Sequence, residues 1–187
     1  MAIATGRHHL GTENGRLILR TSRDGMAATA GHDLTIEATR WSGELTVDDD
    51  KNPSALEATI DMGALSVVKG EGGIKPLSDR DRREVATTAR RLLATDRNPE
   101  AHFAATRFEP SGDGGTIEGD LTIRGVTHPI RLQVTQPEPG KYRASGTVKQ
   151  TDYGIRPYTA FLGALKVRDA VELEATVEVP EPGDTGE

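Results

Sequence analysis

The sequence predicts a mainly β fold, a single domain of antiparallel strands with one inserted α-helix. Three observations support this prediction. Apolar and polar residues alternate along several segments, short turns separate these segments, and only one segment has helical spacing. Strands of this kind and number close into a barrel or pack as a sandwich. The length of 187 residues suits one domain.

The N-terminal half contains the first strands. Residues 16–21 and 25–47 are rich in Thr, Ile, Leu and Val, with glycine-containing breaks at 24–25 and 31–33. The apolar positions change from even to odd numbers near Arg40, which predicts a bulge or bend there. Residues 48–53 (DDDKNP) read as a turn, and residues 56–62 alternate again. We expect residues 1–15 to form a flexible leader.

One amphipathic helix is expected at about residues 79–94. Ser78 is a good N-cap, with Asp81 three residues later, and Asn98-Pro99 stops the helix. Residues 69–76 (KGEGGIKP) form a flexible loop before it. We expect the apolar face of the helix to cover the barrel with Val85, Ala89, Leu92 and Leu93.

Alternation resumes after the helix and continues to residue 179. Turns at 111–114, 124–125 and 137–140 separate the strands, which favours an antiparallel meander over βαβ units. We expect residues 180–187 (PEPGDTGE) to form a disordered tail, so that residues 16–179 make up the domain.

Composition excludes several classes of function. A formal charge of -6 and a pI near 5.4 argue against a nucleic-acid partner. The lack of cysteine excludes disulfides, thiolate zinc sites and a cysteine nucleophile. The sequence contains no apolar window of membrane-span length, and the first twenty residues contain no apolar run of signal-peptide length. We therefore expect a cytoplasmic protein without an integral membrane segment.

Several motifs resemble the YceI-like family. Residues 98–103 (NPEAHF) and 117–130 (IEGDLTIRGVTHPI) look like its Pro-to-Phe step and its G-x-LT-x-x-GVT-x-P strand pair. Residues 31–32, 41–43, 79–81 and 152–155 also match, in the family's order, so the resemblance covers nearly the whole chain. It implies a lipocalin-like barrel of eight antiparallel strands that encloses an apolar tube for polyisoprenoid chains such as quinone tails.

The residues expected to bind this lipid lie mostly on the apolar strand faces. They are Ala28, Leu34, Ile36, Ala58, Phe103, Leu121, Ile123 and Leu132. His32 shares a face with Leu34 and could offer a hydrogen bond to a polar head group. The alternative for His32 is a turn histidine bonded to local backbone.

Residues 153–163 concentrate three of the seven aromatic residues in a segment with Gly and Pro. Tyr153, Tyr158 and Phe161 either form a lid at the lipid entrance or plug one end of the barrel.

Taken with these patterns, the resemblance implies a non-catalytic protein that binds, sequesters or transports an isoprenoid-type lipid, such as an isoprenoid quinone. No cofactor is required, and no metal-ligand spacing or catalytic motif occurs. Aromatic residues make up only 4% of the chain, which suits a hollow barrel lined by Ala, Val, Leu and Ile. Two alternatives remain open, a ligand-free interaction module with a filled barrel and a small-molecule enzyme. Formation of a homodimer is also left open.

Overall fold

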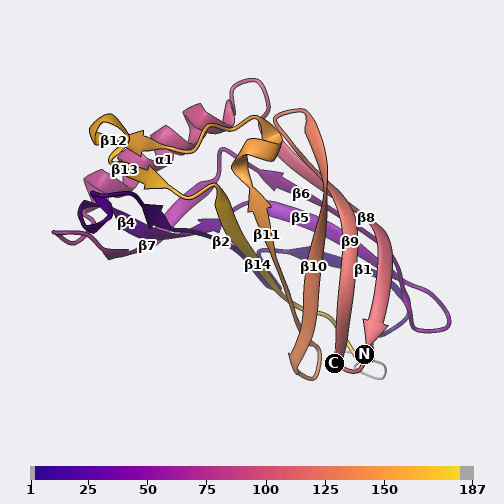
Figure 1. The fold of residues 1–187 in the computed structure, drawn as a ribbon. Helices are drawn as coiled ribbons and strands as arrows, with labels where there is room; N and C mark the ends of the chain where they lie inside the picture. Colours follow the sequence, from indigo (N-terminus) through magenta and orange to yellow (C-terminus); the bar gives the residue numbers. More distant parts are fainter. Residues whose placement is uncertain (1–2, 182–187) are drawn as a thin grey trace.

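The computed structural model describes residues 3–181 of the chain as one strongly curled antiparallel sheet with a helix beside it (Figure 1). The strands of this sheet are β1 (Gly6–Gly11), β2 (Gly15–Thr21), β4 (His32–Ala38), β5 (Trp41–Val47), β6 (Pro53–Asp61), β7 (Leu65–Gly72), β8 (Glu100–Ser111), β9 (Gly114–Ile123), β10 (Val126–Glu138), β11 (Lys141–Lys149) and β14 (Ala170–Glu178). Their order is β1-β5-β6-β8-β9-β10-β11-β14-β2-β4-β7.

The expected number of eight strands is wrong, because this sheet has 11. The cause is that three long arms of the chain are each broken in two. These arms are residues 6–21, which form β1 and β2, residues 32–47, which form β4 and β5, and residues 53–72, which form β6 and β7. Within this sheet β14 pairs with β2, so the last long strand returns to the first arm.

The phase change predicted near Arg40 is confirmed as the break between β4 and β5. Ala38 pairs with Leu65 and Trp41 pairs with Ile60. Residues 39–40 of one arm therefore lie opposite residues 61–64 of the other. The backbone bonds continue across the break, because Thr39 N–H donates to the Ala64 carbonyl at 2.8 Å. The bend lets Ala38 and Trp41 both face the interior despite the change from even to odd numbering.

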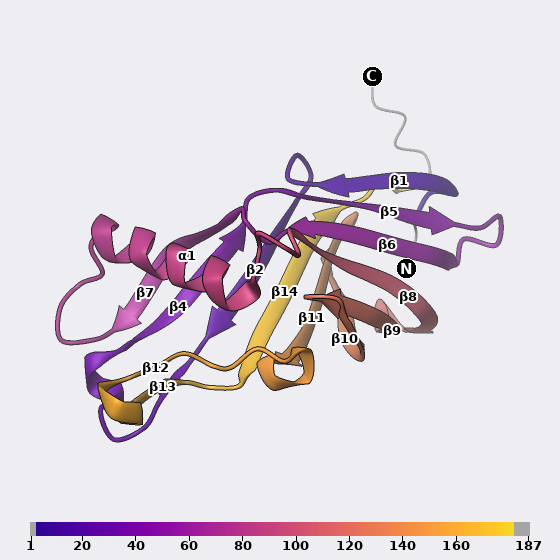
Figure 2. The ribbon, with the colours of Figure 1, turned by 90° about the horizontal axis from the view of Figure 1, so that it is seen from above.

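Helix α1 (Asp79–Leu93) confirms the predicted helix and its N-cap. Ser78 Oγ accepts from the Asp81 backbone N–H at 3.2 Å, and the Asp81 carboxylate accepts from the Ser78 N–H at 2.9 Å. The helix ends before Asn98-Pro99, since Ala94 already takes a left-handed conformation with φ of 50°. Figure 2 shows α1 alongside β7, the edge strand, where Arg82 Nη1 donates to the Val67 carbonyl at 3.0 Å.

The expectation of a flexible leader at residues 1–15 is wrong for the described residues. Strand β1 pairs with β5 along its whole length, and Ile3 is only 3% exposed. Ile3 and Leu10 bury their side chains in a cluster with Val179, which pins this segment to the end of the last long strand. Residues 182–187 of the expected tail lie outside the described residues, but Pro180 already accepts a backbone bond from Ala4.

A small second sheet lies beside the curled sheet. It joins β12 (Thr159–Ala160), β13 (Leu165–Val167) and β3 (Arg23–Asp24) in that order. Three short 3-10 helices flank these strands and the end of β11, namely η1 (Ala28–Ala30), η2 (Gln150–Tyr153) and η3 (Phe161–Gly163). This sheet lies across from α1 at the end of the molecule away from the chain termini (Figures 1 and 2).

Candidate functional site

The curled sheet, α1 and the small sheet enclose a cavity of about 900 Å³. Its lining is mainly aliphatic and comes from strands all around the sheet, including Leu19, Ile36, Ile60, Leu132 and Leu173. This volume is near the upper end of the roughly 300–1,000 Å³ that is usual for small-molecule sites. The interior of the barrel is therefore hollow rather than filled with side chains.

The cavity runs along the length of the barrel. At the end where β1 begins, it is lined by Ile3, Leu10 and Val179, which are all buried. At the other end it is lined by Ile74 and Phe161, whose side chains are 79% and 66% exposed. The lining thus becomes solvent-exposed near η3 and the β7–α1 loop, and the cavity opens there.

Ten of the twelve residues predicted to contact lipid lie along this cavity. They are His32, Leu34, Ile36, Ala58, Phe103, Leu121, Ile123, Leu132, Tyr158 and Phe161. Period-two alternation placed the strand residues correctly, since Phe103 pairs with Leu121 on one side and with Ala58 on the other. Their role as lipid contacts stays a prediction.

Ala28 does not line the cavity, contrary to the prediction. It lies in η1, a 3-10 turn between β3 and β4, where side chains do not alternate between two faces. Ala30 and Gly31, two and three residues later, reach the cavity instead.

Tyr153 is also absent from the cavity lining. Its side chain is 1% exposed in the core beside Ile155, and its ring meets His128 edge-on at 5.6 Å. Burial raises the pKa of the Tyr153 phenol to about 12, with a smaller contribution from the Asp152 carboxylate. Tyr153 therefore anchors η2 in the core, whereas Tyr158 and Phe161 lie at the opening of the cavity.

His32 combines the two predicted environments. The residue lines the cavity near its opening, and its Nε2 lies 2.8 Å from the Lys75 backbone carbonyl oxygen. This contact ties the start of β4 to the loop before α1. The geometry favours the turn histidine bonded to backbone over a group left free for a lipid head group.

Among the polar residues of the lining that the sequence reasoning missed, two differ from the rest in their hydrogen bonding. Thr21 Oγ1 and Trp41 Nε1 are buried, line the cavity and have no hydrogen-bond partner among residues 3–181. A buried polar group without a partner costs free energy that a ligand can recover. The odd-numbered alternation of Leu17, Leu19 and Thr21 was the available signal for one of them. Trp41, the chain's single Trp, also provides a fluorescent reporter inside the cavity.

The helix face predicted to cover the barrel does line the cavity. Val85, Ala89, Leu92 and Leu93 are all half-buried, and none is fully buried. Leu92 and Leu93 pack against the core cluster around Phe103. The helix thus closes part of the cavity wall instead of completing a packed core.

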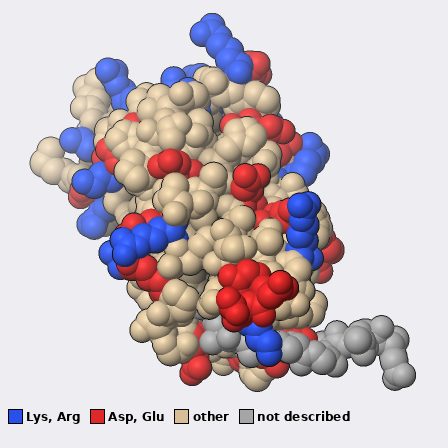
Figure 3. All heavy atoms as spheres, turned by 90° about the vertical axis from the view of Figure 1, so that its right-hand side faces the viewer, with Lys and Arg blue, Asp and Glu red and all other residues tan. Residues whose placement is uncertain are grey.

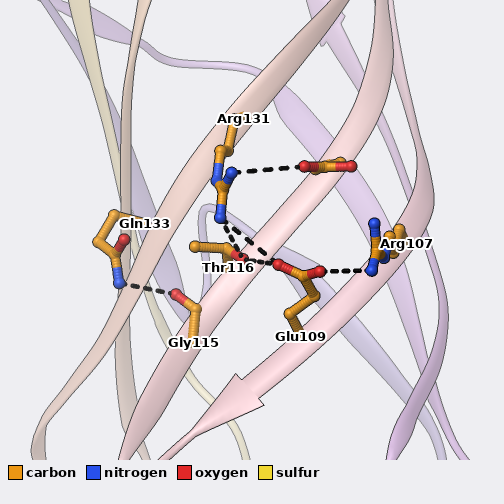
Figure 4. Close-up of polar contacts among 7 residues, drawn as sticks. Arg107, Glu109, Gly115, Thr116, Arg131 and Gln133 are labelled. Atoms are coloured by element: carbon orange, nitrogen blue, oxygen red, sulfur yellow. Dashed lines mark hydrogen bonds and ion pairs between the residues drawn. The ribbon is translucent and has the colours of Figure 1, made fainter.

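The most connected polar cluster lies across β8, β9 and β10 (Figure 4). Glu109 accepts from Thr116 Oγ1 at 3.1 Å and pairs with Arg107 at 2.6 Å and Arg131 at 3.4 Å. These charged side chains are 38% to 63% exposed and satisfy one another, which is typical of cross-strand pairing on an outer sheet face. Figure 3 shows charges of both signs spread over the end of the molecule that it faces.

No group of three or more His, Cys, Asp or Glu that could hold a metal ion occurs within residues 3–181. In the same part of the chain, no helix has the length and apolar character needed to cross a membrane.

The sequence is similar to curated bacterial proteins over part of its length. A UPF0312 protein of Pseudomonas aeruginosa is 32% identical over 125 residues, which cover 62% of this chain and 60% of that protein. Protein YceI of Escherichia coli O157:H7 is 30% identical with the same coverage. The chain thus matches about 60% of the length of these relatives.

Solved structures share the fold at lower sequence identity. Burkholderia cenocepacia BcnA aligns with a TM-score of 0.63 at 15% identity, over 89% of this chain and 96% of that one. A Campylobacter jejuni YceI protein aligns with a TM-score of 0.58 at 18% identity, over 79% and 84%. A family model described as the YceI-like domain matches residues 20–179, most of the curled sheet described above. The chain therefore belongs to the YceI-like family.

Proposed function

We propose that the chain holds a long apolar lipid of the isoprenoid type, such as an isoprenoid quinone, in its cavity and sequesters or transports it without catalysis. The observation that supports this most is the elongated aliphatic cavity of about 900 Å³. A cavity of this size and lining offers space for an apolar molecule and few groups for chemistry. No cofactor is needed for this role.

The shape of the cavity favours a chain over a compact ligand. His32 and Leu45 both line it and lie 13 residues apart on one arm. At about 3.3 Å per residue, these two residues are at most about 43 Å apart, and strand tilt shortens the cavity further. A flexible hydrocarbon chain can fill such a space along its length.

The energetics also suit an apolar chain. Each methylene group moved from water into an apolar cavity contributes about 0.8 kcal/mol, so a ligand with several isoprene units binds tightly even with loose fit. Trp41 Nε1 can donate one hydrogen bond to a polar atom of the ligand, and Thr21 Oγ1 can donate or accept one. These two groups favour a lipid with an oxygen-bearing end, such as a quinone ring.

The two alternatives have less support. A solid interaction module needs an interior filled by side chains, whereas this interior holds the cavity of about 900 Å³. An enzyme needs a nucleophile with its base or an acid–base pair in its site. The lining does include ionisable residues such as His32 and Asp81, but His32 Nε2 lies against the Lys75 carbonyl and the Asp81 carboxylate accepts hydrogen bonds from Ser78.

The test is to identify what the protein carries and then to narrow the cavity. Native mass spectrometry of protein purified without detergent, followed by organic extraction, should reveal a bound isoprenoid lipid. A quinone with an isoprenoid tail should quench Trp41 fluorescence to saturation. If the extract contains no isoprenoid lipid and the quinone does not quench Trp41 fluorescence to saturation, the proposal is contradicted.

The Ala58→Phe variant tests the position of the ligand. Ala58 lines the cavity, and a phenylalanine there that displaces about three methylene groups of ligand should weaken quinone binding about 50-fold. Ala104→Phe is the matched control, because Ala104 is exposed on β8 and does not line the cavity. Equal quinone affinity in the two variants would place the ligand outside the cavity.

A further inference from the structure

Three segments meet around the opening of the cavity, and together we call them the lip. They are residues 22–31, 72–77 and 156–168. Ala27 N–H donates to the Ala164 carbonyl at 2.9 Å, which joins the first segment to the third. The His32 contact with the Lys75 carbonyl, at 2.8 Å, joins the second segment to the start of β4. Figure 1 shows these segments together at the end opposite the chain termini.

The lip presents large apolar side chains to solvent. Leu162 is fully exposed, Met26 is 96% exposed, and Ile74 and Phe161 are 79% and 66% exposed. The large exposed apolar residues of the described chain outside the lip, Val68 and Val126, are only 41% and 38% exposed. An exposed apolar cluster of this kind usually marks a contact surface.

The backbone of η3 holds two of these side chains outward. Phe161 has φ of 51° and Leu162 has φ of 54°, the left-handed region that bulky residues rarely adopt. Such a conformation persists only where the surrounding structure enforces it, and it is common at functional positions. Gly163 follows with φ of 89°, so the chain turns sharply behind Leu162.

The lip is basic although the chain is acidic. It contains five basic residues and one acidic residue, Asp24, whereas the whole chain has a formal charge of -6. The basic residues are Arg23, Lys75, Arg156, Lys166 and Arg168, of which Arg23 is paired with Asp33, just outside the lip, at 3.8 Å. The first six residues of α1, which follow the second segment, carry three acidic and three basic residues and leave this balance unchanged.

We propose that the lip docks onto the surface of an anionic phospholipid bilayer. Met26, Ile74, Phe161 and Leu162 enter the boundary between head groups and acyl chains, and the basic residues lie against the anionic head groups. Because Ile74 and Phe161 also line the cavity, docking places its opening against the apolar layer. An apolar ligand then passes between bilayer and cavity without crossing water. The docking step needs no ligand, whereas its use for loading depends on the proposed function.

Vesicle flotation tests the docking. Vesicles of phosphatidylcholine with phosphatidylglycerol should bind the protein, and vesicles of phosphatidylcholine alone should bind it much less. Leu162→Asp should lower the partition constant about tenfold or more, because it places a charge at the most exposed apolar side chain of the lip. The substitution leaves folding intact, since Leu162 is fully exposed and Asp tolerates a left-handed backbone.

Charge variants separate the electrostatic part of the interaction. Lys75→Gln and Lys166→Gln each remove one charge of the lip, and each should weaken binding to the anionic vesicles about fivefold. The controls are Val126→Asp for the apolar change and Lys51→Gln for the charge change, because both residues are exposed outside the lip. Both controls should bind vesicles like the wild type.

The outcomes are distinct for docking and for lipid binding. Wild-type-like flotation of Leu162→Asp, or equal loss in Val126→Asp, would refute docking by the lip. The lip could instead join two copies of the protein. A wild-type dimer in light scattering that Leu162→Asp dissociates, together with no vesicle binding, would refute docking on a bilayer. If vesicles bind through the lip but quinone does not quench Trp41, docking is correct and the proposed lipid function is wrong. Quenching without vesicle binding gives the reverse result.

Discussion

Replacement of Tyr153 by Phe should stabilise the protein and remove a sensitivity to alkali. The Tyr153 hydroxyl is buried and has no hydrogen-bond partner among the described residues, so its removal should raise the free energy of unfolding by about 1–3 kcal/mol at neutral pH. The raised pKa, about 12 instead of 10.0, adds a dependence on pH. The unfolded phenol loses its proton first, so the titration of Tyr153 has no effect on stability below pH 10 and lowers the stability progressively as pH rises toward 12.

The size of the effect follows from the shift of the pKa. At about pH 11 the wild type should have lost roughly 1.4 kcal/mol through this group, and Tyr153→Phe should have lost none of it. Urea unfolding of both proteins at neutral pH and at pH 11 measures the change in their difference, which cancels the titration of Tyr142, Tyr158 and the lysines. A difference that stays constant with pH would refute the burial of the Tyr153 hydroxyl. Quinone binding should be unchanged, because Tyr153 lies outside the cavity lining.

Three further variants test the helix, its cap and one cross-strand pair. Leu92→Ala should lower the free energy of unfolding, measured in urea, by only about 1 kcal/mol, since Leu92 is half-buried at the cavity. A decrease of roughly 2–5 kcal/mol, as for a packed core, would show that the interior is filled. Hydrogen bonds from Ser78 lower the pKa of Asp81, so the stabilising charge is present at neutral pH and is lost as pH falls through that lowered value. Asp81→Ala should therefore destabilise the protein at neutral pH and have little effect on its stability in strong acid. An equal effect at both pH values would exclude the charged cap. The hydrogen bond from Arg16 lowers the pKa of Glu37, and Arg16→Gln should return it toward 4.5 in an NMR titration, whereas an unchanged value would show that the pair is not formed in solution.

Local rules were sufficient where the chain follows one period. Ser78 and Asp81 predicted a cap that needs only residues close in sequence, and the structure forms it. The change of the apolar positions from even to odd numbers near Arg40 predicted the bend between β4 and β5, and this signal also needs only residues close in sequence. Phe103 and Leu121 were placed on the inner face because each lies within an unbroken strand.

Local rules failed where tertiary contacts decide the structure. Residues 6–11 alternate weakly, and they become a strand because β5 offers an edge and Ile3 and Leu10 find a buried cluster. Ala28 lies between two strands, but a 3-10 turn interrupts the alternation that its assignment assumed. An aromatic residue such as Tyr153 suits a core and an entrance equally well, so only its neighbours in space distinguish the two.

The hollow interior and the exposed lip both leave apolar surface without a partner in the protein. The inward side chains are mainly aliphatic and too short to meet across the barrel. Gly119 shows how closely the few large rings fit within the wall, since a Cβ there would lie 2.5 Å from the Phe103 ring. Packing contacts that a filled core would make are therefore missing along the cavity, and the proposed lipid would supply them. The same chain leaves Phe161 and Leu162 in water at the opening, where a bilayer would cover them. Both features cost stability in water, and both costs would be recovered if the proposed lipid filled the barrel and a bilayer covered the lip.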